Sequence, residues 1–243
     1  MNTFSDSVTT ALHLLFSFDP QLWVIVGRSL AVSATACAIG YALGVLLGAV
    51  LAVSRFRGRS AVMVALNTLL ALPSVVVGLV VYLLLSRTGP LGFLSWLFSF
   101  KAMVLAQVIL VLPVVTALTR QVVEDVERQH GEQWLSLGAG PWLRSLILAW
   151  DERMALMTIF VTAFGRAVSE VGAVMIVGGN IDGFTRVMTT AIALETSKGD
   201  LPLALALGLV LLAVVGVLNW LVALLRGRAD GAQSAAPALV GGL

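Results

Sequence analysis

Charged residues and cysteine are both scarce in this chain. Only 12% of its 243 residues are Asp, Glu, Lys or Arg, against about 25% in soluble domains, and the mean hydropathy is +0.99. A single cysteine, Cys37, excludes a disulfide or a cysteine metal site within one chain. The sequence also lacks a histidine cluster, paired carboxylates or an activated nucleophile. We therefore expect no catalytic residues, no metal and no cofactor in this chain.

Two further absences bear on targeting and on energy supply. No basic residue precedes Arg28, so the N-terminus lacks the positive region of a cleavable signal peptide, and the first apolar span is expected to direct its own insertion. The only lysines are Lys101 and Lys198, and neither stands in a G-x-x-x-x-G-K-[ST] phosphate-binding loop. The chain is therefore not expected to hydrolyse ATP in that manner.

What the sequence has instead is a series of long apolar stretches. They cover residues 29–53, 61–86, 102–119, 154–181 and 201–225. A helix needs about 20 apolar residues to cross a hydrocarbon core of about 30 Å. Only the fourth stretch carries charges, Arg166 and Glu170. The pattern predicts an all-α integral membrane protein with five transmembrane helices.

The basic residues predict an orientation. The loops 54–60 and 120–153 together with the C-terminus hold nine Lys and Arg residues, and the opposite side holds five. The positive-inside rule places the nine in the cytoplasm and the N-terminus outside. We expect three regions: an external amphipathic segment at 1–26 with Asp6 as a helix cap, a transmembrane domain at 27–226, and a disordered cytoplasmic tail at 227–243.

Several residues within the spans predict local features. Pro73 and Pro113 remove backbone donors and are expected to kink their helices, either to line a pathway or only to adjust shape. Gly40, Gly44 and Gly48 form a ridge of small residues that lets another helix approach closely, within the same subunit or in another one.

The segment 120–153 predicts a docking element. Gly131 is expected to break the preceding helix, and Glu132–Leu137 to form a short helical turn. Gly138, Gly140 and Pro141 would end that turn before an apolar helix at Trp142–Trp150. A short helix between two breaks suits a groove on a partner protein.

This segment resembles the cytoplasmic signature of type I ABC-importer permeases, E-A-A-x-x-x-G-x9-I-x-L-P. Glu132 takes the acidic position, Gly138 follows six residues later, and Leu148 stands at the isoleucine. Gln133 and Trp134 replace the two alanines, and Trp150-Asp151 replaces Leu-Pro.

Other segments resemble the molybdate and tungstate branch of these permeases, and the resemblance covers about residues 27–226. The run S-E-V-G-A followed by G-G-N-I-D-G-F-T is similar to molybdate permeases, whereas T-R-V-M-T-T-A-I-A-L-E-T-S-K-G-D is more similar to tungstate permeases. The resemblance implies the type I ABC importer fold, a prokaryotic cell membrane and tungstate import, with molybdate or sulfate as alternatives. From another class, an ion-coupled carrier centred on Arg166 and Glu170 is disfavoured because the chain has no internal repeat.

The resemblance also implies partners and site residues. We expect a second copy of the chain, an external oxoanion-binding protein, and ATPase subunits that hold ATP and magnesium. The residues expected to dock the ATPase are Glu132, Gln133, Trp134, Gly138 and Pro141. The residues expected to contact the binding protein or receive its oxoanion are Thr185, Arg186, Thr189 and Thr190. The alternative hypothesis for this outer loop is a solvated surface that only docks the partner and does not bind the oxoanion.

Arg166 and Glu170 leave two hypotheses open. Being four residues apart, they would share one helical face and form a pair inside the protein. The pair would either lock this helix to its neighbours or stand at the gate of the anion path, where Pro73 and Pro113 are further candidates.

Overall fold

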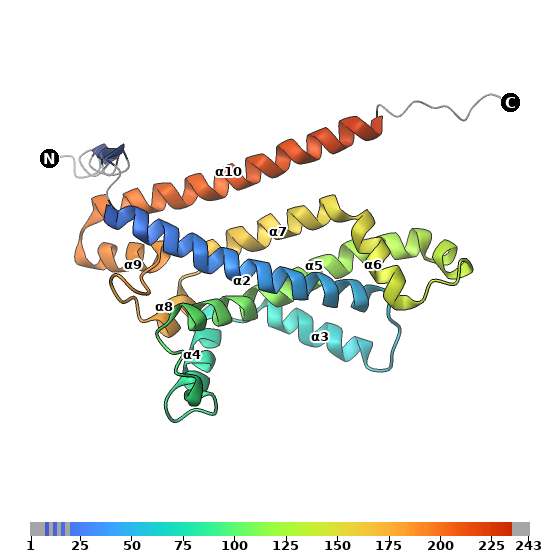
Figure 1. Cartoon of the computed structure of the whole chain (residues 1–243), viewed down its shortest axis with the longest axis horizontal. Coiled ribbons are helices and arrows are strands. Elements are labelled where there is room, and N and C mark those ends of the chain that lie inside the picture. Colours follow the sequence, from blue (N-terminus) through green and yellow to red (C-terminus); the bar gives the residue numbers. More distant parts are fainter. Residues whose placement is uncertain (1–7, 10–11, 14–15, 18–19, 235–243) are drawn as a thin grey trace.

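The computed structural model describes residues 8–9, 12–13, 16–17 and 20–234. Within these residues all regular structure is helical (Figure 1). The helices are α2 (Pro20–Val53), α3 (Arg59–Leu70), α4 (Ser74–Leu85), the short 3-10 helix η1 (Gly92–Leu94), α5 (Phe100–Ser136), α6 (Pro141–Asp151), α7 (Arg153–Val168), α8 (Gly172–Gly178), α9 (Met188–Lys198) and α10 (Leu201–Ser234).

Helices α2 and α5 run side by side and form the centre of the fold (Figure 1). The glycine ridge of α2 faces α5: a Cβ on Gly44 would lie 2.7 Å from the Cβ of Val115, and one on Gly48 would lie 2.6 Å from the carbonyl oxygen of Thr116. Small residues at such positions let two backbones approach closely. The ridge is therefore used for packing within one subunit.

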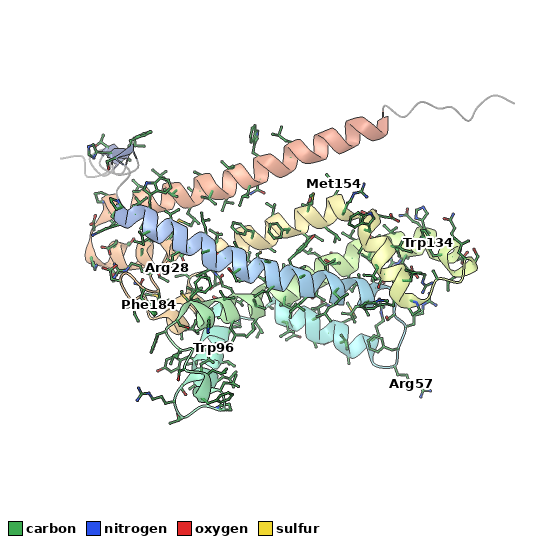
Figure 2. The ribbon with its side chains drawn as sticks, viewed as in Figure 1. Arg28, Arg57, Trp96, Trp134, Met154 and Phe184 are labelled. Atoms are coloured by element: carbon green, nitrogen blue, oxygen red, sulfur yellow. The ribbon has the colours of Figure 1, made fainter. Side chains whose placement is uncertain are left out.

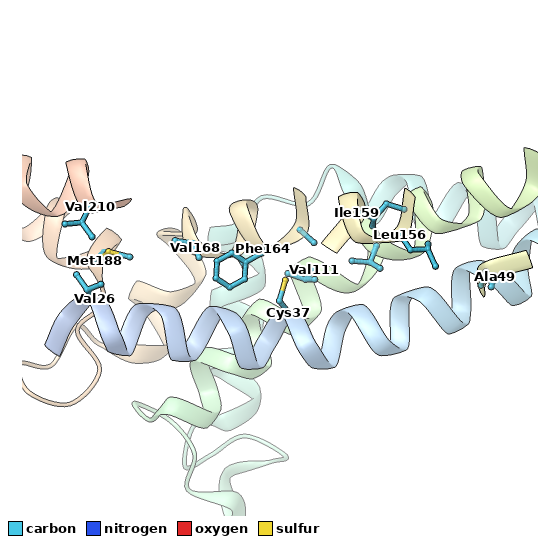
Figure 3. Packing of buried hydrophobic residues seen from close by; sticks show 14 of the residues in the cluster. Val26, Cys37, Ala49, Val111, Leu156, Ile159, Phe164, Val168, Met188 and Val210 are labelled. Atoms are coloured by element: carbon cyan, nitrogen blue, oxygen red, sulfur yellow. The ribbon is translucent and has the colours of Figure 1, made fainter. Parts of the chain in front are cut away.

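A continuous buried cluster extends along this helix pair (Figure 3). Cys37 of α2 and Val111 of α5 are almost fully buried in it, and Phe164 of α7 covers them. The ring of Tyr41 meets that of Phe160 edge to face, with 5.2 Å between the ring centroids. These contacts hold α7 against α2, and the following α8 packs against α4 and α5.

The predicted spans correspond to three long helices and two bent pairs. Helices α2, α5 and the Leu201–Trp220 part of α10 are each long and apolar enough to cross a membrane. Helix α3 joins α4 with a bend of 100°, and α7 joins α8 with a bend of 56°. Each bent pair counts as one span only if the break lies within the membrane, which gives up to five spans by length and composition.

The first and last long helices extend beyond the predicted boundaries of the transmembrane domain at residues 27 and 226. Helix α2 begins at Pro20, so residues 20–26 belong to the first long helix and not to a separate surface segment. The remainder of the predicted amphipathic segment, with its Asp6 cap, lies mostly outside the described residues. Helix α10 continues to Ser234, so residues 227–234 are helical, where the sequence predicted disorder. A helix bonds its own backbone and can continue past the apolar stretch.

The two groups of basic residues lie at opposite ends of the molecule. Arg28 and Phe184 mark one end, and Arg57 and Trp134 mark the other (Figure 2). Helix α5 has 37 residues and is therefore about 55 Å long, well beyond a hydrocarbon core of about 30 Å. Its last turns project out of the bilayer at the Trp134 end.

The close packing of α2 on α5 gives a first prediction. Gly48→Ala should destabilise the protein by about 1–3 kcal/mol, because the added Cβ meets backbone atoms of α5. Gly27→Ala is the matched control on the same helix, since no described residue lies within 4 Å of a Cβ there. Thermal unfolding of the detergent-solubilised protein measures both. Equal melting temperatures for the two variants would contradict the packing.

Candidate functional site

The two helix breaks lie next to each other. Helix α4 starts directly after Pro73, and α8 starts at Gly172. A Cβ on Gly172 would lie 2.8 Å from the Oγ of Ser74, and one on Gly78 would lie 2.8 Å from the Cα of Ala173. The starts of α4 and α8 therefore pack directly on each other, and at Gly78 an added side chain would meet the backbone of Ala173. The sequence predicted a kink at Pro73, whereas the structure has a complete break at residues 71–73.

Glu170 stabilises the second break. Its Oε1 accepts a hydrogen bond of 3.2 Å from the backbone N–H of Ala173, in the first turn of α8. A carboxylate at this position pairs with a free amide and with the positive end of the helix dipole. The backbone carbonyl of Glu170 accepts a 2.7 Å hydrogen bond from the hydroxyl of Thr189. Gln107 of α5 donates to the carbonyl of Ala167 at 2.9 Å, so side chains of two other helices, α5 and α9, cover this break.

The predicted pair of Arg166 and Glu170 is wrong for the single chain. Helix α7 ends at Val168, so the two residues do not share a helical face. No ion pair joins them among the contacts of the described residues. Arg166 is exposed on the single subunit and lies in the last turn of α7. The helix dipole stabilises a cation at this position. The spacing of four implied a pair only while the helix was assumed to continue.

Pro113 neither ends nor interrupts its helix. It is buried within α5, which is continuous from Phe100 to Ser136. Its near neighbours in the sequence, Val111 and Val115, meet the glycine ridge of α2. The structure therefore does not place Pro113 at either of the two breaks.

The docking element is an elbow at the projecting end of α5. The predicted break at Gly131 is wrong, because α5 continues through Gly131 to Ser136. The break at Gly138 is confirmed: its φ is +78°, a conformation that favours glycine. The N–H of Ala139 donates to the carbonyl of Trp134, and that of Gly138 donates to the carbonyl of Leu135, which closes the helix end.

Pro141 begins the second arm of the elbow, at the first position of α6. Of the predicted docking residues, Glu132, Gln133, Gly138 and Pro141 are exposed, and Trp134 is half-buried. The sequence predicted an apolar helix at Trp142–Trp150 but did not include in the docking surface the large exposed apolar side chains of the elbow: Leu135, Leu137, Trp142, Leu143, Leu146 and Trp150. An apolar surface outside the predicted spans is a candidate protein contact.

Ion pairs connect the elbow to the rest of this end. Glu124 of α5 accepts from Arg120 and from Arg128, and its Oε1 lies 3.4 Å from Arg59 of α3. One turn further, Glu127 lies 3.3 Å from Arg144 of α6. The charges that the sequence placed in separate loops thus meet across three helices.

The outer threonines are used inside the fold. Thr185, Thr189 and Thr190 are buried. Thr185 donates to the carbonyl of Gly178, and Thr190 donates to that of Val187. The prediction that these hydroxyls meet an external partner is therefore wrong in this conformation. Thr185 and Thr190 close the loop between α8 and α9 internally, and Thr189 bonds to the carbonyl of Glu170 at the α7–α8 break.

The longest exposed run of that loop is Ile181–Phe184. Behind it, a cavity of about 620 Å³ is lined by Arg28, Arg186, Lys198, Asp182 and Glu195 among others. Arg28 donates to the carbonyl of Gly183 at 2.7 Å, and Arg186 pairs with Asp182 at 3.2 Å. Phe184, 60% exposed, was missed from sequence because a lone aromatic residue in a loop carries no distinguishing pattern. In the described ranges no group of three His, Cys, Asp or Glu side chains could hold a metal ion.

These features define a class: a multi-pass membrane protein with two broken helices in contact and an elbow projecting from one end. Residues 44–231 match the family described as binding-protein-dependent transport system inner membrane component. The chain belongs to this family. It is therefore a transport subunit of the prokaryotic plasma membrane and not an enzyme, and the predicted type I ABC importer fold is confirmed.

Individual relatives agree with this assignment. The chain is 43% identical to a tungstate uptake system permease protein of Peptoclostridium acidaminophilum, over 90% of this chain and 96% of the relative. It is 37% identical to a tungstate uptake system permease protein of Campylobacter jejuni, over 89% and 90%. Identity is 30% to the molybdenum transport system permease protein of Escherichia coli, over 87% and 97%.

The role of Glu170 as a cap gives a second prediction. Glu170→Leu should cost about 0.5–2 kcal/mol through loss of the cap, while Glu170→Gln keeps an acceptor for the Ala173 amide and should cost less. Because no ion pair joins Arg166 to Glu170 among the described residues, the effects of Arg166→Leu and Glu170→Leu should add within about 0.5 kcal/mol. Thermal unfolding of the single and double variants measures this. A double variant more stable than Glu170→Leu alone would restore the ion-pair hypothesis.

Proposed function

We propose that the chain is the membrane subunit of an ATP-driven importer that brings tungstate into the cytoplasm. The observation that carries the proposal is the 43% identity, along almost the full length of both chains, to a tungstate uptake permease. Molybdate is the alternative substrate, favoured by the 30% identity to a molybdenum permease. Family membership speaks against the ion-coupled carrier.

In this proposal the elbow docks an ATPase subunit that binds ATP and magnesium. The docking surface consists of Glu132, Gln133, Trp134, Gly138 and Pro141, with the exposed apolar side chains of the elbow around them. Support comes from the exposure of this surface and from its position beyond the membrane-crossing part of α5. The projecting end is then cytoplasmic, and α2 begins outside, in agreement with the distribution of basic residues.

The proposed pathway lies between two copies of the chain. Arg166 is exposed on the single subunit although it lies in an apolar span, and a charge facing lipid there would cost about 2.5–3.5 kcal/mol. A second copy, or water in a pathway between two copies, would remove that cost. Support comes from the positions of Pro73, Glu170 and Arg166 at or next to the two breaks, because transporters often bind substrate at broken helices.

At the outer end, the loop tip Ile181–Phe184 is proposed as the contact for an oxoanion-binding protein. Phe184 offers an exposed aromatic anchor. Arg186 stays the one predicted contact residue whose side chain is partly exposed, at 17%, and it lines the outer cavity.

Docking at the elbow gives a third prediction. Gly138→Val should abolish substrate-stimulated ATP hydrolysis in reconstituted complexes, because a β-branched residue does not adopt a φ of +78°. Gly138→Asn should retain most of the stimulation, since asparagine tolerates this conformation. Both variants should insert normally, as no span is altered. Unchanged stimulation in Gly138→Val would refute the docking role.

The substrate gives a fourth prediction. Cells with the intact transporter should accumulate tungsten from trace tungstate even with molybdate in large excess, and a deletion strain should not. Sulfate should compete poorly, because a smaller tetrahedron would leave donors under-satisfied in a site shaped for a larger anion. Elemental analysis of cellular metal measures this. If deletion lowers molybdenum and leaves tungsten unchanged, the substrate is molybdate.

A further inference from the structure

The base of the elbow is closed by one buried ion pair. The Oε1 of Glu127 on α5 lies 3.3 Å from the Nη1 of Arg144 on α6, and the two side chains are only 18% and 9% exposed. The chain between them contains Glu132, Gln133, Trp134, Gly138 and Pro141 of the proposed docking surface. The pair therefore ties the two arms of the elbow together at the point where they return to the body of the protein.

These two charges depend on each other. Apart from the ion pair, Glu127 Oε2, Arg144 Nε and Arg144 Nη1 have no hydrogen-bond partner among the described residues. The neighbouring Glu124 differs, since three arginines surround it. A buried charge with a single partner loses its compensation when that partner is removed. The Glu127–Arg144 contact is therefore sensitive to small displacements of either helix.

Gly131 provides the space for this contact. A Cβ on Gly131 would lie 2.8 Å from the carboxyl carbon of Glu127 and 2.9 Å from its Oε1. The carboxylate thus lies over Gly131, in the gap left by the missing side chain. This explains a glycine in the interior of a helix, where alanine would favour the helix.

The apolar contacts of α6 are separate from the ion pair. Leu148 and Ala149 are buried in the main cluster with α2 and α5 residues. They lie one turn or more beyond Arg144 and do not involve the carboxylate. Without the ion pair α6 would remain attached to the body, but the turn at residues 138–140 could open as a hinge.

We propose that the Glu127–Arg144 ion pair is a brace that makes the elbow rigid, so that movement of the docked ATPase reaches α5 and is not absorbed at the turn. Glu127, Arg144 and Gly131 are then positioning residues for coupling. The proposal rests on the proposed docking of an ATPase at the elbow.

The decisive variant is Gly131→Ala, which keeps both charges and improves helix propensity but displaces the Glu127 carboxylate. We expect normal insertion and normal co-purification of the ATPase. The assay uses proteoliposomes that contain the complete transporter, supplied with the binding protein and tungstate. In this assay the number of tungstate ions transported per ATP hydrolysed should fall roughly fivefold or more. The double variant Glu127→Gln with Arg144→Met removes both charges together and should behave in the same way.

Two matched controls belong to the same assay. Asp125→Asn removes an exposed carboxylate from α5, and Gly208→Ala adds a Cβ where nothing lies within 4 Å. Both should couple like the unmodified protein. Wild-type coupling in Gly131→Ala overturns the brace while leaving the docking proposal intact. Failure of the ATPase to co-purify with the unmodified chain would instead refute the docking, and with it the brace.

Discussion

The absence of water in the bilayer core is the constraint on which this structure depends. A backbone amide or carbonyl left without a partner there costs several kcal/mol, so each interruption of a helix must be covered by protein. At the α7–α8 break the cover comes from Glu170, Gln107 and Thr189, which belong to three different parts of the chain. At the α3–α4 break it comes from tight turns, in which Ala71 and Leu72 donate to the carbonyls of Thr68 and Leu69.

The same constraint explains where the glycines are needed. Gly78 and Gly172 let the covered breaks of two spans touch, and Gly44 and Gly48 let α2 lie directly on α5. Without a strong hydrophobic force between helices in lipid, close backbone contact is a main source of stability. Charges are correspondingly concentrated at the two ends, where Glu124 and Glu127 join helices at one end and Arg28 holds the α8–α9 loop at the other.

The predictions that failed have a common cause. The pairing of Arg166 with Glu170 assumed a continuous helix, and the break at Gly131 assumed that a glycine ends one. Both conclusions came from local propensity, whereas tertiary contacts decided the outcome: Glu170 is drawn to the amide of Ala173, and Gly131 makes room for the carboxylate of Glu127. The outer threonines were expected at the surface for their chemistry, but the same hydroxyls close the loop internally.

The sequence by itself determined the five apolar stretches, the concentration of basic residues on one side, and the turn at Gly138, because hydropathy, charge and a positive φ act over short ranges. The sequence also indicated the protein family, because the motifs that identify it are contiguous in the chain. Only the tertiary structure decided that two breaks meet, that Glu170 is a cap, and that Glu127 faces Arg144. These contacts join residues that are brought together by helix packing, and no spacing along the chain encodes which of many possible partners will be nearest.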